Sequence, residues 1–107
     1  MTSTIRALCC AIALLAAPAA AQAAGDAVAG KAKAYTCLGC HGIEDYKNVY
    51  PTYHVPKLAG QNAEYIVAAL TAYANGERTH ETMHAHAASL SAEDIQDIAA
   101  YFASSGQ

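Results

Sequence analysis

The stretch Cys37-Leu38-Gly39-Cys40-His41 decides how the rest of the chain is interpreted. Two thiols three residues apart lie on one side of a helical turn, where they can add as thioethers to the two vinyl groups of one haem. The imidazole that follows directly then falls below the iron. This spacing predicts one covalently attached haem c, with Cys37 and Cys40 as its attachment points and His41 as an axial ligand of the iron.

Two other kinds of site also use closely spaced cysteines. A thioredoxin-like redox motif needs a preceding strand and a βαβ frame, and the pattern around Cys37 indicates neither. A zinc site could combine Cys37 and Cys40 with His80 and His84, but 39 residues separate the two pairs. That gap is far longer than the loop of a typical zinc finger. Haem attachment is therefore the favoured interpretation, with zinc binding as an open alternative.

The first 23 residues have the pattern of a secretory signal peptide. A positively charged start ends at Arg6, an apolar run covers residues 7–17, and Ala21-Gln22-Ala23 has the small residues that signal peptidase requires. The apolar run is too short for a membrane span, which needs about 20 residues. We therefore expect a signal peptide over residues 1–23, cleaved after Ala23, and a single domain over residues 24–107. We also expect a periplasmic location and no stable membrane anchor after cleavage.

The expected mature chain is acidic and has few large hydrophobic side chains. Residues 24–107 contain five Lys or Arg and nine Asp or Glu, which gives a net charge of −4 with neutral His. An acidic surface argues against binding to nucleic acid or to anionic membranes. Because a domain of this size is marginally stable without a staple or a cofactor, we expect haem to form most of its core.

Hydrophobic periodicity predicts three helices and no strand. The first covers about residues 27–36, the second covers about residues 62–74, and the third begins at Ser91 with an S-x-x-D capping box. Long loops over residues 41–61 and 76–90 connect them and are long enough to serve a site. The predicted fold is all-α, with three main helices and long loops wrapped around one covalent haem. The side chains expected to face the core are Tyr65, Ile66, Ala69, Leu70 and Tyr73 on the second helix and Ile95, Ile98, Ala99 and Phe102 on the third.

Met83 is the candidate for the second axial ligand. It is the only methionine after Ala23, and it lies among polar residues in the loop before the last helix, where packing explains little. Thioether ligation opposite a histidine raises the reduction potential of a haem, which suits electron transfer. The competing ligands would give bis-histidine ligation and a lower potential, but we expect them to be solvated surface residues: His80, His84 and His86.

Together these features resemble class I cytochromes c, closest to short bacterial forms of the c-553 type and single domains of the c-4 type. The resemblance implies that Met83 is the axial ligand opposite His41. It also implies that the carbonyl of Pro56 accepts a hydrogen bond from the ligand imidazole, which fixes the orientation of the ring. The matching segments are Gly25-Asp26-Ala27 with Gly30, residues 37–42, residues 56–61, Tyr65, residues 76–78, Met83, residues 90–95 and residues 99–103.

The same resemblance implies a function and leaves one region unmatched. Outer-sphere transfer of single electrons between redox partner proteins transforms no substrate, so we expect the chain not to be an enzyme. A close crossing of the first and last helices would place Gly30 opposite the region of Tyr101. The aromatic-rich loop of residues 46–54 has no match in the family pattern. Two alternatives stay open: a haem subunit permanently docked on a larger redox enzyme, and a ligand-binding haem protein.

Overall fold

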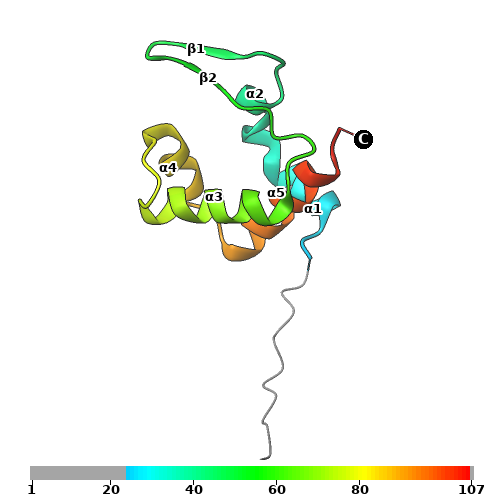
Figure 1. The fold of residues 1–107 in the computed structure, drawn as a ribbon. Helices are drawn as coiled ribbons and strands as arrows, with labels where there is room; N and C mark the ends of the chain where they lie inside the picture. The colour runs from blue at the N-terminus through cyan, green and yellow to red at the C-terminus, as the bar shows by residue number, and fades with distance from the viewer. Residues whose placement is uncertain (1–23, 107) are drawn as a thin grey trace, which may run out of the picture.

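The computed structural model describes residues 24–106, which form helices and one small β-hairpin (Figure 1). The signal peptide predicted for residues 1–23 lies outside the described residues. Strands β1 (Lys47–Val49) and β2 (Thr52–His54) pair antiparallel, with Lys47 opposite His54. The helices are α1 (Ala27–Lys33), the 3₁₀ helix η1 (Ala34–Thr36), α2 (Leu38–His41), α3 (Ala63–Asn75), α4 (Glu81–Ala87) and α5 (Ala92–Ser104).

The mostly helical fold expected from the sequence is confirmed, and the three main helices lie where the pattern predicts them. The Asp26 side chain caps α1 by accepting from the backbone N–H groups of Val28 and Ala29. Ser91 and Asp94 form the predicted capping box of α5, with distances of 3.0 and 3.1 Å. Helix α3 ends at Asn75, and Gly76 follows in the left-handed conformation with φ of 82°.

Two elements contradict the expectation of three helices joined by irregular loops. The first is the β-hairpin, which was missed because each strand has three residues, too few to show a reliable period of two. The second is α4, which occupies part of the predicted loop of residues 76–90. Only Met83 and Ala87 of its seven residues face the core, and its N-cap is His80 rather than one of the usual Ser, Thr, Asp or Asn caps.

The hydrophobic core lies mainly between α3 and α5, and its largest fully buried side chains are Ile98 and Phe102. The predicted buried face of α5 is confirmed. The predicted stripe on α3 is wrong at Tyr65, which is 51% exposed because its hydroxyl accepts a hydrogen bond from Arg78 at the surface. The buried apolar residues are Ala34, Ile66, Leu70, Ala87, Ile95, Ile98, Ala99 and Phe102.

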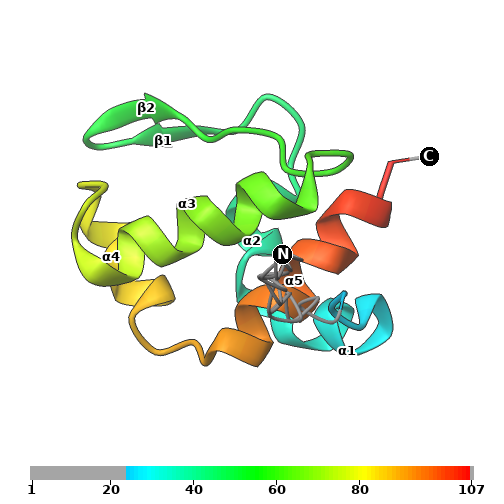
Figure 2. The same cartoon turned by 60° about the horizontal axis from the view of Figure 1, so that its bottom comes forward.

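Helices α1 and α5 cross in close contact, as the sequence predicts (Figure 2). A Cβ atom on Gly30 would collide with the backbone carbonyl of Asp97 and would lie 2.9 Å from the Cβ of Tyr101. Only glycine therefore allows this approach of the two backbones. The crossing also contains a charged contact that the periodicity did not reveal. The Nζ of Lys33 lies 2.6 Å from Asp97 Oδ2 and 2.9 Å from Asp94 Oδ1.

Candidate functional site

The residues of the Cys37–His41 motif form one continuous helical turn. The backbone N–H of Cys37 donates to the carbonyl of Ala34, and the N–H of His41 donates to the carbonyl of Cys37 at 2.8 Å. Cys37 is half-buried against the core, Cys40 is exposed, and both are free thiols. Burial raises the pKa of the Cys37 thiol. The turn thus presents two free thiols and one imidazole from a single short segment.

The His41 ring is fixed by a segment on the far side of the hairpin. Its Nδ1 lies 2.8 Å from the carbonyl oxygen of Pro56, 15 residues later in the chain. Because a carbonyl oxygen only accepts, Nδ1 carries the proton and donates it. In the neutral ring the lone pair is then on Nε2, which is the form that binds a metal. The hairpin between the two residues is closed at its base by a hydrogen bond from Val55 N–H to the Tyr46 carbonyl at 2.9 Å.

Met83 lies in the first turn of α4, not in an irregular loop. Its side chain is half-buried and packs against the core cluster. The expectation that packing explains little at this position is therefore wrong. The error has a local cause: the polar neighbours Thr82 and His84 are exposed, and the turn of α4 directs Met83 away from them, toward the interior.

His80 is not a solvated surface residue, which corrects the expectation for this side chain. It is half-buried, and its Nδ1 accepts a hydrogen bond from the backbone N–H of Met83 at 3.4 Å, which caps α4. Its ring meets the ring of Tyr53 edge-on, with centroids 4.9 Å apart, and that of Tyr73 at 6.3 Å. With Nδ1 acting as acceptor, the neutral ring carries its proton on Nε2, so neither nitrogen is free to bind a metal in this arrangement.

The other two histidines lie on the exposed side of α4, as expected. His84 is nevertheless anchored, because its Nδ1 donates to the backbone carbonyl of Tyr73 at 2.7 Å. His86 is exposed in the last turn of the helix. Helix α4 is therefore fastened to its surroundings by His80 at its start and by His84 one turn later.

The donor set around His41 fits a covalent haem c and does not fit a zinc site. Within residues 24–106, no group of three or more His, Cys, Asp or Glu side chains is arranged to hold a metal ion. The zinc alternative that joins Cys37 and Cys40 to His80 and His84 is therefore not supported. Two free thiols on one turn, followed by an imidazole with an available Nε2, are instead the groups that haem c requires.

The structure brings together some of the site residues predicted from the sequence and adds residues that were not predicted. Cys37, Cys40 and His41 share one turn, and Pro56 meets His41. Met83 is contributed separately by α4. The cluster of His80 with Tyr53 and Tyr73 was not predicted. Three aromatic side chains from distant segments carry no spacing signal, and only the unmatched loop of residues 46–54 pointed to this region.

Comparison with known proteins agrees with the motif. Residues 22–106 match the family model described as cytochrome c. The chain is 45% identical over 84 residues to cytochrome c4 of Pseudomonas aeruginosa, covering 78% of this chain and 40% of that protein. It is also 45% identical over 84 residues to cytochrome c-554(548) of Halomonas halodenitrificans, covering 76% of this chain and 98% of that protein.

A third relative is the cytochrome subunit of sulfide dehydrogenase from Chlorobaculum tepidum, 36% identical over 73 residues, which cover 68% of this chain and 63% of that subunit. The chain thus spans less than half of the cytochrome c4 and nearly all of cytochrome c-554(548). Within residues 24–106, no helix has the length and apolar character needed to cross a membrane. The chain belongs to the cytochrome c family, which implies a covalently attached haem c.

Proposed function

We propose that this cytochrome c is a periplasmic one-electron carrier whose haem is attached through Cys37 and Cys40 and whose iron is bound by His41 and Met83. When bound, haem c supplies a one-electron Fe(II)/Fe(III) couple. The chain's own residues hold the axial donors, exclude water and keep the geometry constant between redox states. Its partners are redox proteins that deliver and accept single electrons.

The observation that carries the proposal is the hydrogen bond from His41 Nδ1 to the Pro56 carbonyl, 2.8 Å long. It fixes the tautomer, leaves Nε2 as the donor, and increases the basicity of the ring. Such a bond is expected for a histidine that keeps one orientation while bound to a metal. Electron transfer benefits from this restraint, because little structural change then accompanies the change of redox state.

Met83 is supported as the second ligand by its position and by the engagement of the neighbouring His80. It is the only methionine in residues 24–107, and its side chain points inward from α4. His80, by contrast, uses Nδ1 to cap α4. A thioether opposite a histidine favours Fe(II) and gives a raised potential.

The test compares haem-loaded wild type with Met83→Leu and Met83→Ala by optical spectra and potentiometric titration. Met83→Leu keeps the volume of the side chain but removes the sulfur. We expect both variants to lose the weak near-infrared sulfur-to-iron band. We also expect both potentials to fall by on the order of 0.1 V or more, which is about 2 kcal/mol for one electron.

A methionine that acts only in packing would give a different result, because Met83→Leu would then keep the wild-type spectrum and potential. Bis-histidine ligation would appear as a low-spin spectrum without the near-infrared band, lost on changing His84 or His86 to Ala. The periplasmic location rests on the signal-peptide pattern of residues 1–23. N-terminal sequencing of the protein from a periplasmic extract, which should begin at Ala24, tests it.

The second candidate is a haem subunit docked on a larger redox enzyme. It is favoured by the similarity to the cytochrome subunit of sulfide dehydrogenase. Purification at native expression levels separates the two functions. A diffusing carrier elutes alone at the mass of one small chain, whereas a subunit co-purifies with its enzyme at a fixed stoichiometry.

A further inference from the structure

The inward face of the hairpin reaches the helix that carries Met83. Asn48 and Tyr53 lie opposite each other in the register and are half-buried, whereas Lys47, Val49, Thr52 and His54 are exposed. Figures 1 and 2 both show the hairpin leaving the end of α2 and extending over α4. At the point of contact, the ring of Tyr53 meets the ring of His80 edge-on, with an interplanar angle of 87°.

His80 connects this contact to Met83. Its ring has Tyr53 from β2 at 4.9 Å and Tyr73 from α3 at 6.3 Å. Its Nδ1 accepts from the backbone N–H of Met83, so the orientation of the ring determines whether the cap of α4 is formed. The ring of Tyr53 therefore restrains the group to which the Met83 backbone is bonded.

We infer that Tyr53 is a positioning residue: by holding the His80 ring it keeps Met83 in its ligand position, and it thereby controls how easily another ligand replaces Met83. This inference rests on the proposed function, which assigns Met83 to the iron. An edge-to-face pair of rings is a directional contact that adds to simple burial. Loss of this pair weakens the cap, and the first turn of α4, with Met83, opens more often.

Tyr53 is well suited to this role because it is separate from the core. Tyr53 is neither in the core cluster nor among the hydrophobic side chains packed against it. Removing the Tyr53 ring should therefore loosen α4 without opening the contact between α3 and α5. A positioning role and a general stabilising role thus give different experimental results.

The experiment titrates the ferric haem-loaded protein with imidazole, which competes with the native sixth ligand. We expect Tyr53→Leu to bind imidazole about 2- to 10-fold more tightly than wild type, the range that one aromatic pair can account for. Tyr53→Phe keeps the ring and should behave like wild type. His54→Ala, on the exposed face of the same strand, is the matched control and should also leave the affinity unchanged.

A double-mutant cycle tests whether the effect passes through His80. His80→Asn removes the ring but keeps a side chain that caps helices well. In that background, Tyr53→Leu should change imidazole affinity less than about 2-fold, because the contact is already absent. An undiminished effect of Tyr53→Leu in the His80→Asn background would overturn the inference.

The two proposals fail in distinguishable ways. If Met83→Leu keeps the near-infrared band, the ligand assignment is wrong, and the inference about Tyr53 falls with it. If Met83→Leu abolishes the band while Tyr53→Leu binds imidazole like wild type, the ligand assignment stands and only the role of Tyr53 is wrong.

Discussion

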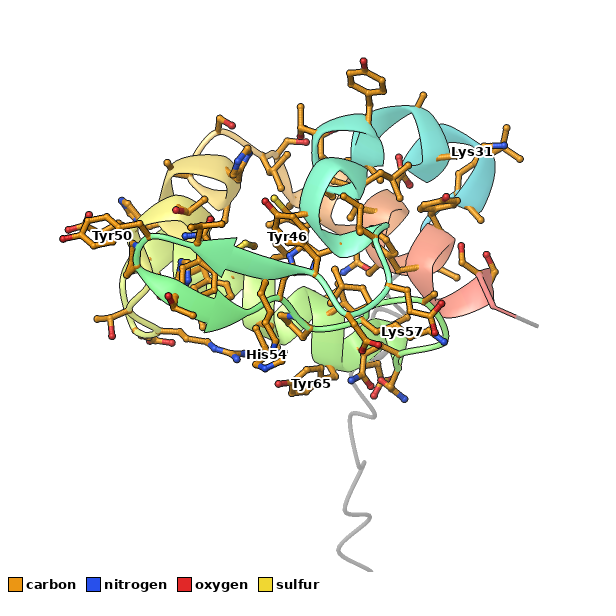
Figure 3. All side chains as sticks on the ribbon, turned by 90° about the horizontal axis from the view of Figure 1, so that it is seen from above. Lys31, Tyr46, Tyr50, His54, Lys57 and Tyr65 are labelled. Atoms are coloured by element: carbon orange, nitrogen blue, oxygen red, sulfur yellow. The ribbon has the colours of Figure 1, made fainter. Side chains whose placement is uncertain are left out.

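The crossing of α1 and α5 and the contact of the hairpin with α4 hold the molecule in different ways. At the crossing, backbones touch at Gly30, Asp97 is 5% exposed, and Lys33 pairs with three carboxylates. At the hairpin, strands of three residues rest on α4 through the rings of Tyr53 and His80, and the tip is open to solvent. Figure 3, seen from above, shows Tyr50 projecting from the tip of the hairpin.

The difference suggests that the crossing determines the stability of the domain, whereas the hairpin contact allows local opening beside Met83. The crossing cannot shift without a collision of backbone atoms or the loss of the Lys33 ion pairs, so it is expected to open only when the domain unfolds. The hairpin contacts His80 through one aromatic pair, and His80 caps α4 through one long hydrogen bond, so this cap is expected to open locally at lower cost. The two axial ligands we propose then differ in restraint, with His41 tied to Pro56 and Met83 on the looser side.

The largest effect is expected from removing the covalent attachment of haem at Cys37 and Cys40. Changing Cys37 and Cys40 to Ala should give protein whose haem is extracted by acid acetone and which accumulates poorly. The core has few large side chains, so we expect the chain to depend on haem for its folding. Staining for covalent haem after denaturing electrophoresis measures the attachment, and a positive stain in the double variant would contradict it.

A smaller effect is expected from breaking the crossing alone. In Gly30→Ala, the added methyl group meets the backbone of Asp97 and the Cβ of Tyr101, so the helices must separate. We expect the free energy of unfolding of the haem-loaded protein to fall by about 1–3 kcal/mol. Denaturant unfolding measures this loss. The near-infrared band and the imidazole affinity should stay at wild-type values, because α4 does not take part in the crossing.

Two comparisons test whether the crossing of α1 and α5 is independent of α4. Ala32→Ser changes an exposed residue of the same helix and should alter the free energy of unfolding by less than about 0.5 kcal/mol. Tyr53→Leu should show the opposite pattern to Gly30→Ala, with altered imidazole affinity and a nearly unchanged unfolding transition. If Gly30→Ala alters imidazole affinity as much as Tyr53→Leu does, the two regions are coupled and the proposed independence is wrong.

The smallest effect is expected from the ion pairs of the crossing and depends on pH. Hydrogen bonding to Lys33 is the main cause that lowers the pKa of Asp94 to about 2, and it also lowers the pKa of Asp97. A depressed carboxyl pKa stabilises the folded state above the unfolded pKa, about 4, and the contribution disappears as the pH falls toward about 2. Lys33→Gln should therefore lower the thermal midpoint by at most a few degrees at neutral pH.

The difference in thermal midpoint between wild type and Lys33→Gln separates the contribution of the Lys33 ion pairs from that of other acid-sensitive groups. It should be constant from neutral pH down to about 4 and should shrink between about pH 4 and 2. Lys31→Gln is the matched control, since Lys31 is exposed on the same helix and forms no ion pair within residues 24–106. If the difference in thermal midpoint instead grows as the pH falls, the expected direction of the pH dependence is wrong.

The parts of the fold that the sequence predicts are those with strong local signals. The capping box at Ser91 and the apolar face of α5 fix the last helix, and Asn75-Gly76 fixes the end of α3. The close approach at Gly30 was also predictable, because a glycine inside a helix needs a packing reason. The buried Asp97 was not recognised, although an acidic residue beside Ile98 on an apolar face indicates a buried partner.

The parts that the sequence does not predict depend on contacts between distant segments. Helix α4 has a histidine cap and a core-facing side made only of Met83 and Ala87, which is too short to indicate a helix from its period. The strands of the hairpin are too short to show alternation. The motif of Cys37, Cys40 and His41 is local and is read directly, and the Pro56 partner of His41 came from the family resemblance. The role of His80 depends on Tyr53 and Tyr73, which no spacing rule joins to it.

The closed base of the hairpin determines where the chain tolerates a change in length. The His41–Pro56 and Tyr46–Val55 hydrogen bonds hold the two ends of the segment together independently of its tip. At the tip, Val49 is 84% exposed and Tyr50 is 95% exposed, and their side chains contribute neither to the base nor to the contact with His80. Doubling the length of a closed loop costs only about 0.6 kcal/mol. A peptide tag or a labelling sequence inserted after Tyr50 should thus leave both proposed axial ligands in place.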